Sequence, residues 1–177
     1  MKRSVRIILS TLVLSLLCAC ALLSNGPKEP VSFYYTRPRD EYESDRNNEV
    51  IGKEDAVIVS EQREAEGHRD DLNYLLSQYL RGPQDINLMS PFPDRAALTN
   101  VVLRDDTLFV TLTEEFASLS GIDLTVACAC LTRTCLSITE ASQVTIAVEN
   151  SLLDGAKSIT MSESTLLLLD SAVAQPE

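Results

Sequence analysis

The sequence predicts an α+β fold in which two amphipathic helices pack on one antiparallel or mixed sheet, as a two-layer sandwich. Short segments alternate between apolar and polar residues with the period of two that is typical of strands. Two longer segments repeat with the period of a helix. They follow each other in the order β-β-α-β-β-α-β, with a further hairpin near the C-terminus, and such a mixture favours helices layered on a sheet.

The first part of the fold is predicted to hold two strands and one helix. Residues 31–35 alternate and are rich in β-forming residues, and residues 37–48 are predicted to be an exposed charged loop. The next strand covers residues 56–60 and runs on toward Arg63. The helix after it ends at Gly82-Pro83. Its apolar face consists of Leu72, Leu75, Leu76, Tyr79 and Leu80.

The second part begins with an extended link at residues 90–93, whose two prolines prevent regular structure. Residues 101–112 alternate on both sides of Asp105-Asp106 and are predicted to be a hairpin. Ser120 and Asp123 match a capping box at the start of the second helix. Further strands are expected at residues 144–148, in a hairpin over 152–161, and at 166–169. The second helix has an apolar face of Leu124, Ala127, Cys128, Leu131, Cys135 and Ile138.

The N-terminus has the layout of a secretory signal. Lys2, Arg3 and Arg6 precede an apolar run over residues 7–17, which is too short to span a bilayer because a spanning helix needs about 20 residues. The motif Leu17-Cys18-Ala19-Cys20 resembles a lipobox, in which the final Cys is acylated and becomes the first residue of the mature chain. The alternatives are an ordinary cleaved signal or an uncleaved anchor, in which Cys20 has no role.

Lipidation at Cys20 predicts attachment to the outer face of the cell membrane. Each buried methylene of an acyl chain contributes about 0.8 kcal/mol, and stable anchoring takes more than one chain. We therefore expect residues 1–19 to be a lipoprotein signal peptide and residues 20–30 a tether. Residues 31–170 are expected to form one domain, and residues 171–177 a C-terminal tail.

The composition argues against nucleic acid as a partner. The chain of 177 residues has 15 basic and 26 acidic residues, and the signal holds three of the basic ones and none of the acidic ones. The mature chain is therefore strongly acidic and lacks the basic footprint of a nucleic-acid-binding protein.

No residue pattern predicts an enzyme, a metal site or a cofactor. His68 is the only His, and motifs such as G-x-S-x-G and H-E-x-x-H are absent. The pairs Asp105-Asp106 and Glu114-Glu115 lack the series of ligands that a calcium loop needs, and solvated charge is the favoured interpretation. Three Cys lie in the second predicted helix, and their spacing disfavours disulfides, so we expect buried free thiols at Cys128, Cys130 and Cys135.

Two neighbouring tyrosines on the first strand are the candidate partner contacts. Alternation sends one of Tyr34 and Tyr35 inward and the other outward, and the outward side chain is the candidate.

The motifs along the chain resemble the GerMN domain family of sporulation and spore germination lipoproteins. The resemblance covers residues 31–165, and the chain has room for one copy of the domain. It implies an α+β architecture related to ring-building motifs, which tile side by side in secretion and sporulation assemblies. The resemblance is carried, in order, by residues 57–63, Leu75 to Pro83, Ser90-Pro-Phe-Pro93, Leu108 to Phe116, Thr134-Cys-Leu136 and residues 144–149.

Two functions are open from the sequence. The first is a non-catalytic interaction or assembly domain, tethered outside the membrane, with envelope or sporulation proteins as partners and a homo-oligomer as a further candidate. The alternative is a peptidoglycan-binding lipoprotein, or an accessory to a cell-wall hydrolase. The absence of Trp makes stacking on sugars less favourable.

Overall fold

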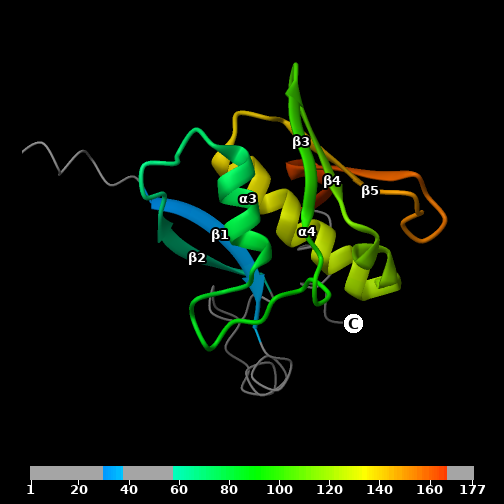
Figure 1. Cartoon of the computed structure of the whole chain (residues 1–177), viewed down its shortest axis with the longest axis horizontal. Coiled ribbons are helices and arrows are strands. Elements are labelled where there is room, and N and C mark those ends of the chain that lie inside the picture. The colour runs from blue at the N-terminus through cyan, green and yellow to red at the C-terminus, as the bar shows by residue number, and fades with distance from the viewer. Residues whose placement is uncertain (1–29, 38–57, 167–177) are drawn as a thin grey trace, which may run out of the picture.

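The computed structural model describes residues 30–37 and 58–166, which form two sheets and two α-helices (Figure 1). The α+β class predicted from the sequence is confirmed, although the strands form two sheets where one was expected. The small sheet pairs β1 (Pro30–Thr36) with β2 (Ile58–Glu64). The large sheet has the order β3 (Leu98–Arg104), β4 (Thr107–Leu112), β5 (Gln143–Val148), β6 (Ser158–Ser162). The helices are α3 (Leu72–Leu80), the 3-10 helix η2 (Glu114–Ser118) and α4 (Gly121–Ile138).

The large sheet is mixed. β3 and β4 form an antiparallel hairpin, β4 and β5 run parallel, and β5 pairs antiparallel with β6. The parallel pair requires a long connection, which η2 and α4 supply. The inner face of the sheet is apolar, because the alternate residues Leu108, Val110, Leu112, Val144, Ile146 and Val148 are buried.

Two predicted strands differ in the structure, while β2 runs past Arg63 to Glu64 as expected; residues 56 and 57 of that predicted strand lie outside the described part of the chain. The hairpin expected over residues 152–161 is wrong: β6 pairs with β5, and Asp154-Gly155 form a tight turn closed by a bridge between Leu153 and Ala156. The strand expected at residues 166–169 does not include residue 166, because residues 163–166 are helical. Residues 167–169 lie outside the described part of the chain.

The two helices begin where the sequence predicts, by different means. Asp71 is the N-cap of α3, and its side chain accepts a hydrogen bond from the Tyr74 N–H at 3.0 Å. Ser120 is the N-cap of α4, but its side chain makes no capping hydrogen bond, so the predicted capping box is absent. α4 is long and apolar enough to cross a membrane, but 56% of it is buried within the domain. Its packing is that of a core helix.

The core lies between the two sheets, where α3 and α4 are placed (Figure 1). Tyr79 of α3 is at its centre. Its ring lies 5.4 Å from that of Phe33, 5.0 Å from that of Tyr35 and 5.1 Å from that of Phe92. These contacts join the small sheet, α3 and the extended link, and aromatic pairs of this kind add about 0.5–1.5 kcal/mol beyond area burial.

Side chains of both helices satisfy the outer edge of β1. The Tyr34 N–H donates to Thr134 Oγ1 at 2.9 Å, and Ser137 Oγ donates to the Ser32 carbonyl at 2.7 Å. The Tyr79 hydroxyl donates to the Tyr34 carbonyl at 2.6 Å. Next along the edge, the backbones of Thr36 and Met89 exchange two hydrogen bonds. The strand edge is thereby closed without a further strand.

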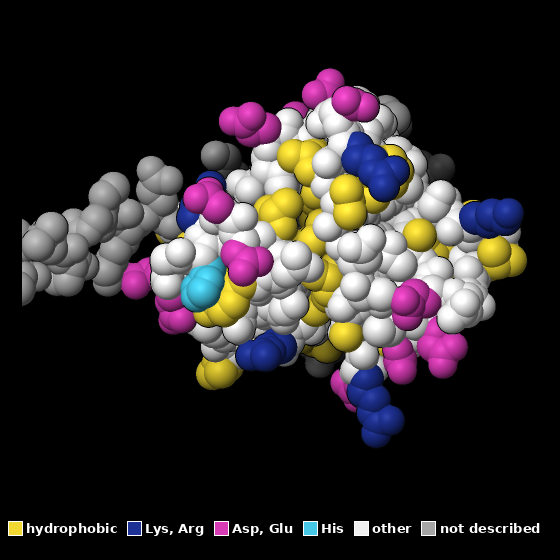
Figure 2. All heavy atoms as spheres, turned by 45° about the horizontal axis from the view of Figure 1, so that its top comes forward, with side chains coloured by type: hydrophobic (Ala, Val, Ile, Leu, Met, Phe, Trp, Pro, Cys, Tyr) yellow, Lys and Arg dark blue, Asp and Glu magenta, His cyan; other side chains and the backbone are white. Residues whose placement is uncertain are grey.

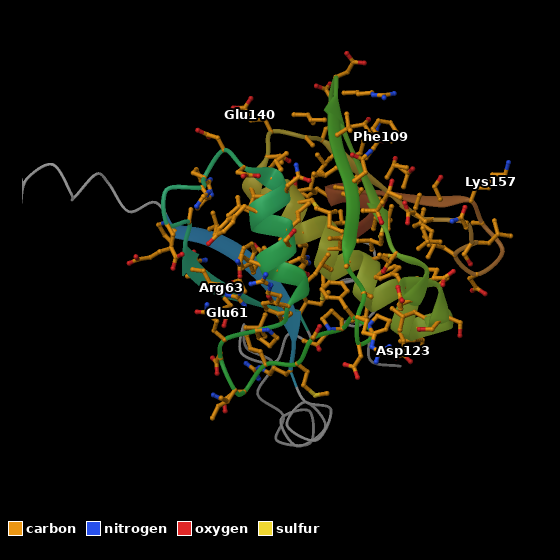
Figure 3. The ribbon with its side chains drawn as sticks, in the orientation of Figure 1. Glu61, Arg63, Phe109, Asp123, Glu140 and Lys157 are labelled. Atoms are coloured by element: carbon orange, nitrogen blue, oxygen red, sulfur yellow. The ribbon has the colours of Figure 1, made fainter. Side chains whose placement is uncertain are left out.

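A second polar network joins β2 to the end of α3 (Figure 3). Arg63 forms an ion pair with Glu61 and donates to the Gly82 carbonyl at 2.7 Å and to the Tyr35 hydroxyl at 2.9 Å. Glu61 accepts the backbone N–H groups of Gln84 and Asp85 at 2.8 and 2.6 Å. Both charged side chains are about nine-tenths buried, so removing either one would leave the other as a buried charge without its partner, which is strongly destabilising.

Several predictions concern residues outside the described part of the chain. They are the signal peptide at 1–19 with Leu17, Cys18 and Ala19, the lipidation of Cys20, most of the tether, the loop over 38–48, and the tail at 171–177.

We expect Thr134→Val to lower the free energy of unfolding by about 1–3 kcal/mol, because it leaves the Tyr34 N–H without a partner. Thr132→Val is the matched control. Thr132 is also fully buried in α4, but its hydroxyl has no hydrogen-bond partner, so its loss should leave stability unchanged or raise it. Urea denaturation of both variants measures the difference, and equal losses would contradict this role of Thr134.

Candidate functional site

The described residues include no group of three or more His, Cys, Asp and Glu side chains that could hold a metal ion. His68 lies exposed in the turn before α3, where its ring stacks on Tyr74 at 4.0 Å between centroids. The hydroxyl of Tyr74 donates to Glu66 at 3.2 Å. This is a surface arrangement that orients the turn.

The two carboxylate pairs lie where the chain turns or forms a short 3-10 helix. Asp105 has a φ of +50° in the β3–β4 turn, a conformation that Asp tolerates better than most residues. The Asp106 carbonyl accepts the N–H groups of Ser142 and Gln143. Glu115 lies in η2, and hydrogen bonding to the Thr113 side chain lowers the pKa of its carboxyl.

The three thiols of α4 are free and buried, as predicted. Burial raises the pKa of Cys128 and of Cys130 to about 12, and raises that of Cys135 as well. Because the thiolate is the reactive form, these groups are chemically inert at neutral pH. They pack as small apolar side chains.

The structure separates the two candidate tyrosines. Tyr35 is fully buried and donates its hydroxyl to the Tyr79 carbonyl at 2.8 Å, so it is the inward tyrosine of the pair and no longer a candidate contact. Tyr34 points the other way, as alternation along the strand requires. It lines a hollow of about 340 Å³ together with Leu136, Ser137 and Glu163. Its role as a partner contact remains a prediction.

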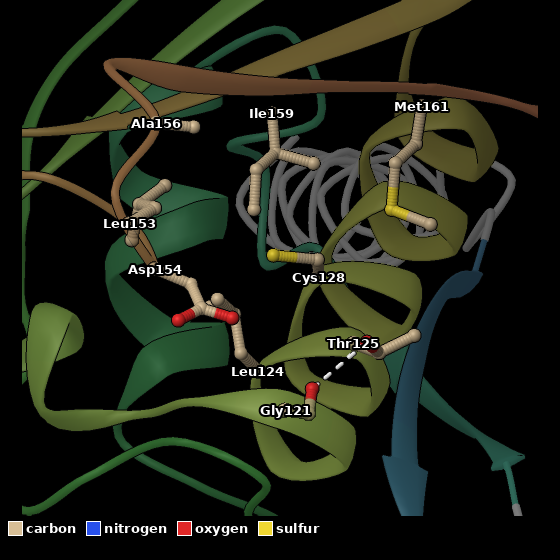
Figure 4. Close-up of a pocket in the computed structure, with 9 residues that line it drawn as sticks. All are labelled: Gly121, Leu124, Thr125, Cys128, Leu153, Asp154, Ala156, Ile159 and Met161. Atoms are coloured by element: carbon tan, nitrogen blue, oxygen red, sulfur yellow. Dashed lines mark hydrogen bonds between the residues drawn. The ribbon is translucent and has the colours of Figure 1, made fainter.

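A more apolar hollow lies between the first half of α4 and the segment that leads into β6 (Figure 4). Its volume is about 280 Å³. Leu124 and Cys128 contribute from the helix, while Ile159 and Met161 point into it from β6. The remaining lining residues are Gly121, Thr125, Leu153, Asp154 and Ala156.

Two exposed apolar side chains are neighbours of this hollow in sequence. Ile122, which follows Gly121, is 77% exposed, and Leu152, which precedes Leu153, is 49% exposed. Figure 2 shows how prominent charged groups are on the surface, with Asp and Glu side chains spread over the face in view. The hollow is the candidate site, and we call it the α4–β6 hollow. Ile122 and Leu152 are the exposed apolar residues next to it in sequence.

The sequence indicates one of the exposed residues next to this site, but not the hollow itself. Ile122 lies off the apolar face predicted for α4, so an outward Ile was readable from the helical period. Leu152 was assigned to a hairpin that does not form, and its exposure follows from the turn at Asp154-Gly155. The hollow itself depends on how β6 crosses α4, which no local pattern encodes.

Comparison with known proteins finds one matching family. The sequence model of the Germane family, described as sporulation and spore germination, matches residues 32–154. None of the curated proteins matches the chain.

Solved structures with a similar fold share little sequence identity with this chain. A candidate lipoprotein from Clostridium perfringens is 16% identical, with 80% of this chain and 93% of that chain covered and a TM-score of 0.47. The first GerMN domain of the sporulation protein GerM from Bacillus subtilis is 14% identical, with 77% and 98% covered and a TM-score of 0.49. The tandem GerMN domains of the same protein are 13% identical, with 76% and 46% covered and a TM-score of 0.49.

The buried thiols predict loss of stability at alkaline pH. The pKa values of Cys128 and Cys130 are about 12 in the folded chain and near their ordinary value of 9.0 when unfolded. Between these values the unfolded state releases protons that the folded state retains, so the free energy of unfolding falls as pH rises above about 9. Urea denaturation at pH 8, 9.5 and 10.5 measures this fall. Burial is checked by the rate at which the three thiols react with a labelling reagent at pH 8. Equal rates in the folded and the unfolded chain would contradict their burial.

Proposed function

Because this chain belongs to the Germane family of sporulation and spore germination domains, we propose that it is a membrane-tethered, non-catalytic interaction domain. It works outside the cell membrane, in a sporulation or cell-envelope complex. The resemblance read from its motifs is confirmed by the family match over residues 32–154.

The observation that carries the proposal is the α4–β6 hollow, because two of its lining residues, Gly121 and Leu153, adjoin the exposed apolar residues Ile122 and Leu152 in sequence. Exposed apolar surface that continues from an apolar hollow is typical of a binding site. An apolar side chain of a partner protein fits a hollow lined by Leu124, Ile159 and Met161. Burial of Ile122 and Leu152 would contribute about 1.5–3 kcal/mol for each side chain that becomes fully buried.

The tether follows from the N-terminal sequence. Positive charge, a short apolar run and Leu17-Cys18-Ala19-Cys20 together support acylation of Cys20. Several acyl chains at one residue make attachment effectively permanent, so the domain would meet its partners in the plane of the membrane.

Replacement of the acylated residue tests the tether. We expect Cys20→Ala to lose its acyl chains and to change the mass of the N-terminal peptide. Cys18→Ala is the matched control, because Ala suits a position that needs a small residue, and it should stay acylated. Detergent phase partition and mass spectrometry of the two variants give the answer. Acylation that persists in Cys20→Ala would overturn the assignment.

Charge placed beside the hollow tests the docking surface. We expect the double variant Ile122→Asp and Leu152→Asp to weaken partner capture at least about tenfold, because a buried, unpaired carboxylate costs several kcal/mol. Ile86→Asp is the matched control. Ile86 is 94% exposed in the loop between α3 and β3.

Capture is measured by crosslinking in membranes that contain the full chain, followed by identification of the crosslinked proteins. Equal loss in the double variant and in Ile86→Asp would remove the hollow as the docking surface. Co-sedimentation of the purified full chain with peptidoglycan, in the absence of any protein partner, would replace the proposal with cell-wall binding.

A further inference from the structure

Within residues 30–37 and 58–166, no helix covers the outer face of the large sheet. Both helices pack between the sheets (Figure 1), and the inner face alone carries the core. Strand register places Val102, Phe109, Thr145 and Thr160 side by side in one row across all four strands of the outer face. Phe109 is 40% exposed at this site, and Figure 3 labels it on the hairpin of β3 and β4.

This face is free of negative charge in an acidic chain. The four strands contain no Asp or Glu, and Arg104 at the end of β3 is their one charged residue. The whole chain has a formal net charge of −11. Two copies of such a chain repel each other through most of their surfaces, and this sheet face is where they can approach at the lowest electrostatic cost.

Hydrogen bonds within the face pair four of its polar side chains. The Thr145 and Thr160 hydroxyls lie 2.9 Å apart, and Gln143 Nε2 donates to Thr107 Oγ1 at 2.8 Å. Burying these two pairs against another protein therefore costs less than burying the same groups without partners. The same pairing disfavours a glycan, which would have to compete for these hydroxyls.

We propose that the outer face of the large sheet binds the same face of a second copy of this chain. A two-fold axis makes such an interface self-complementary, with the two sheets packed about 10 Å apart. Phe109 and Val102 lie in the apolar part of the interface, and Arg104, whose guanidinium lies 5.9 Å from the centre of the Phe109 ring, lies at its rim.

The size of the face makes the contact weak on its own. Four strands spaced about 4.8 Å apart, with five residues each, present on the order of 300 Å² of flat area per copy. Stable interfaces bury about 800 Å² per partner. The self-association therefore rests on the proposed tether, because confinement to the membrane raises the effective concentration of the second copy.

Thiol crosslinking in membranes tests the arrangement. Phe109→Cys and Val102→Cys are each introduced into the full chain, with Ile86→Cys as the exposed control, and membranes are treated with a bis-maleimide whose spacer bridges about 10 Å, the separation of two packed sheets. We expect a crosslinked dimer for the two sheet positions and not for Ile86→Cys, since the native thiols of α4 are buried. Equal crosslinking at Ile86, or none at the sheet positions in a chain that remains membrane-bound, overturns the proposal.

A charged substitution on the sheet face provides a second test of the dimer. Thr160→Glu places one carboxylate from each copy in the interface, and we expect at least about tenfold less dimer in membranes crosslinked with a lysine-reactive reagent. Ile86→Glu, with the same charge change elsewhere, should leave the yield unchanged. An unchanged yield in Thr160→Glu, with its circular dichroism intact, overturns the proposal. Membrane release in Cys20→Ala is scored separately, so failure of the tether is distinguished from failure of the sheet contact.

Discussion

The rest of the structure depends on how the outer edge of β1 finds hydrogen-bond partners. A strand at the edge of a two-stranded sheet presents N–H and C=O groups that cannot be left buried and unpaired. Thr134 and Ser137 of α4 and Tyr79 of α3 supply those partners. The second half of α4 is thereby held against β1. Its first half is left facing β6, where the apolar hollow forms. The partners of one strand edge thus fix the position of α4 and, with it, the position of the α4–β6 hollow.

The sequence predicts the elements of this fold well, because periodicity is a local property. The apolar faces of α3 and α4 follow directly from residue spacing, and both pack on the core as expected, with Leu72 and Leu80 of α3 only partly buried. The role of Thr134 cannot be read locally, since its partner Tyr34 lies 100 residues away. The hairpin expected around Asp154-Gly155 failed for a related reason. The turn forms, but the strand after it gains more by pairing with β5 along the large sheet.

The motifs that carry the family resemblance form the interior framework. Glu61 and Arg63 of the first motif bind the backbone around Gly82 in the second. Phe92 of the proline link lies 6.2 Å from Phe116 at the end of the next motif, and Thr134 opens the following one. These residues stabilise a fold that many members of a family can share. The surfaces that we propose as partner contacts lie elsewhere, at Ile122 and Leu152 and on the outer face of the large sheet. Sequence similarity therefore identified the architecture more readily than the site.

The bond between Tyr34 and Thr134 also has a consequence in time. Its two residues are 100 positions apart in the chain, so β1 can pair with β2 before the segment that forms α4 has emerged on the outer side of the membrane. Until α4 has formed, the outer edge of β1 is an open template for pairing with other chains. The small sheet can be completed only after the C-terminal half is available, which makes the first strand to be synthesised one of the last to be secured. The strong negative charge of the chain separates newly made copies during this period.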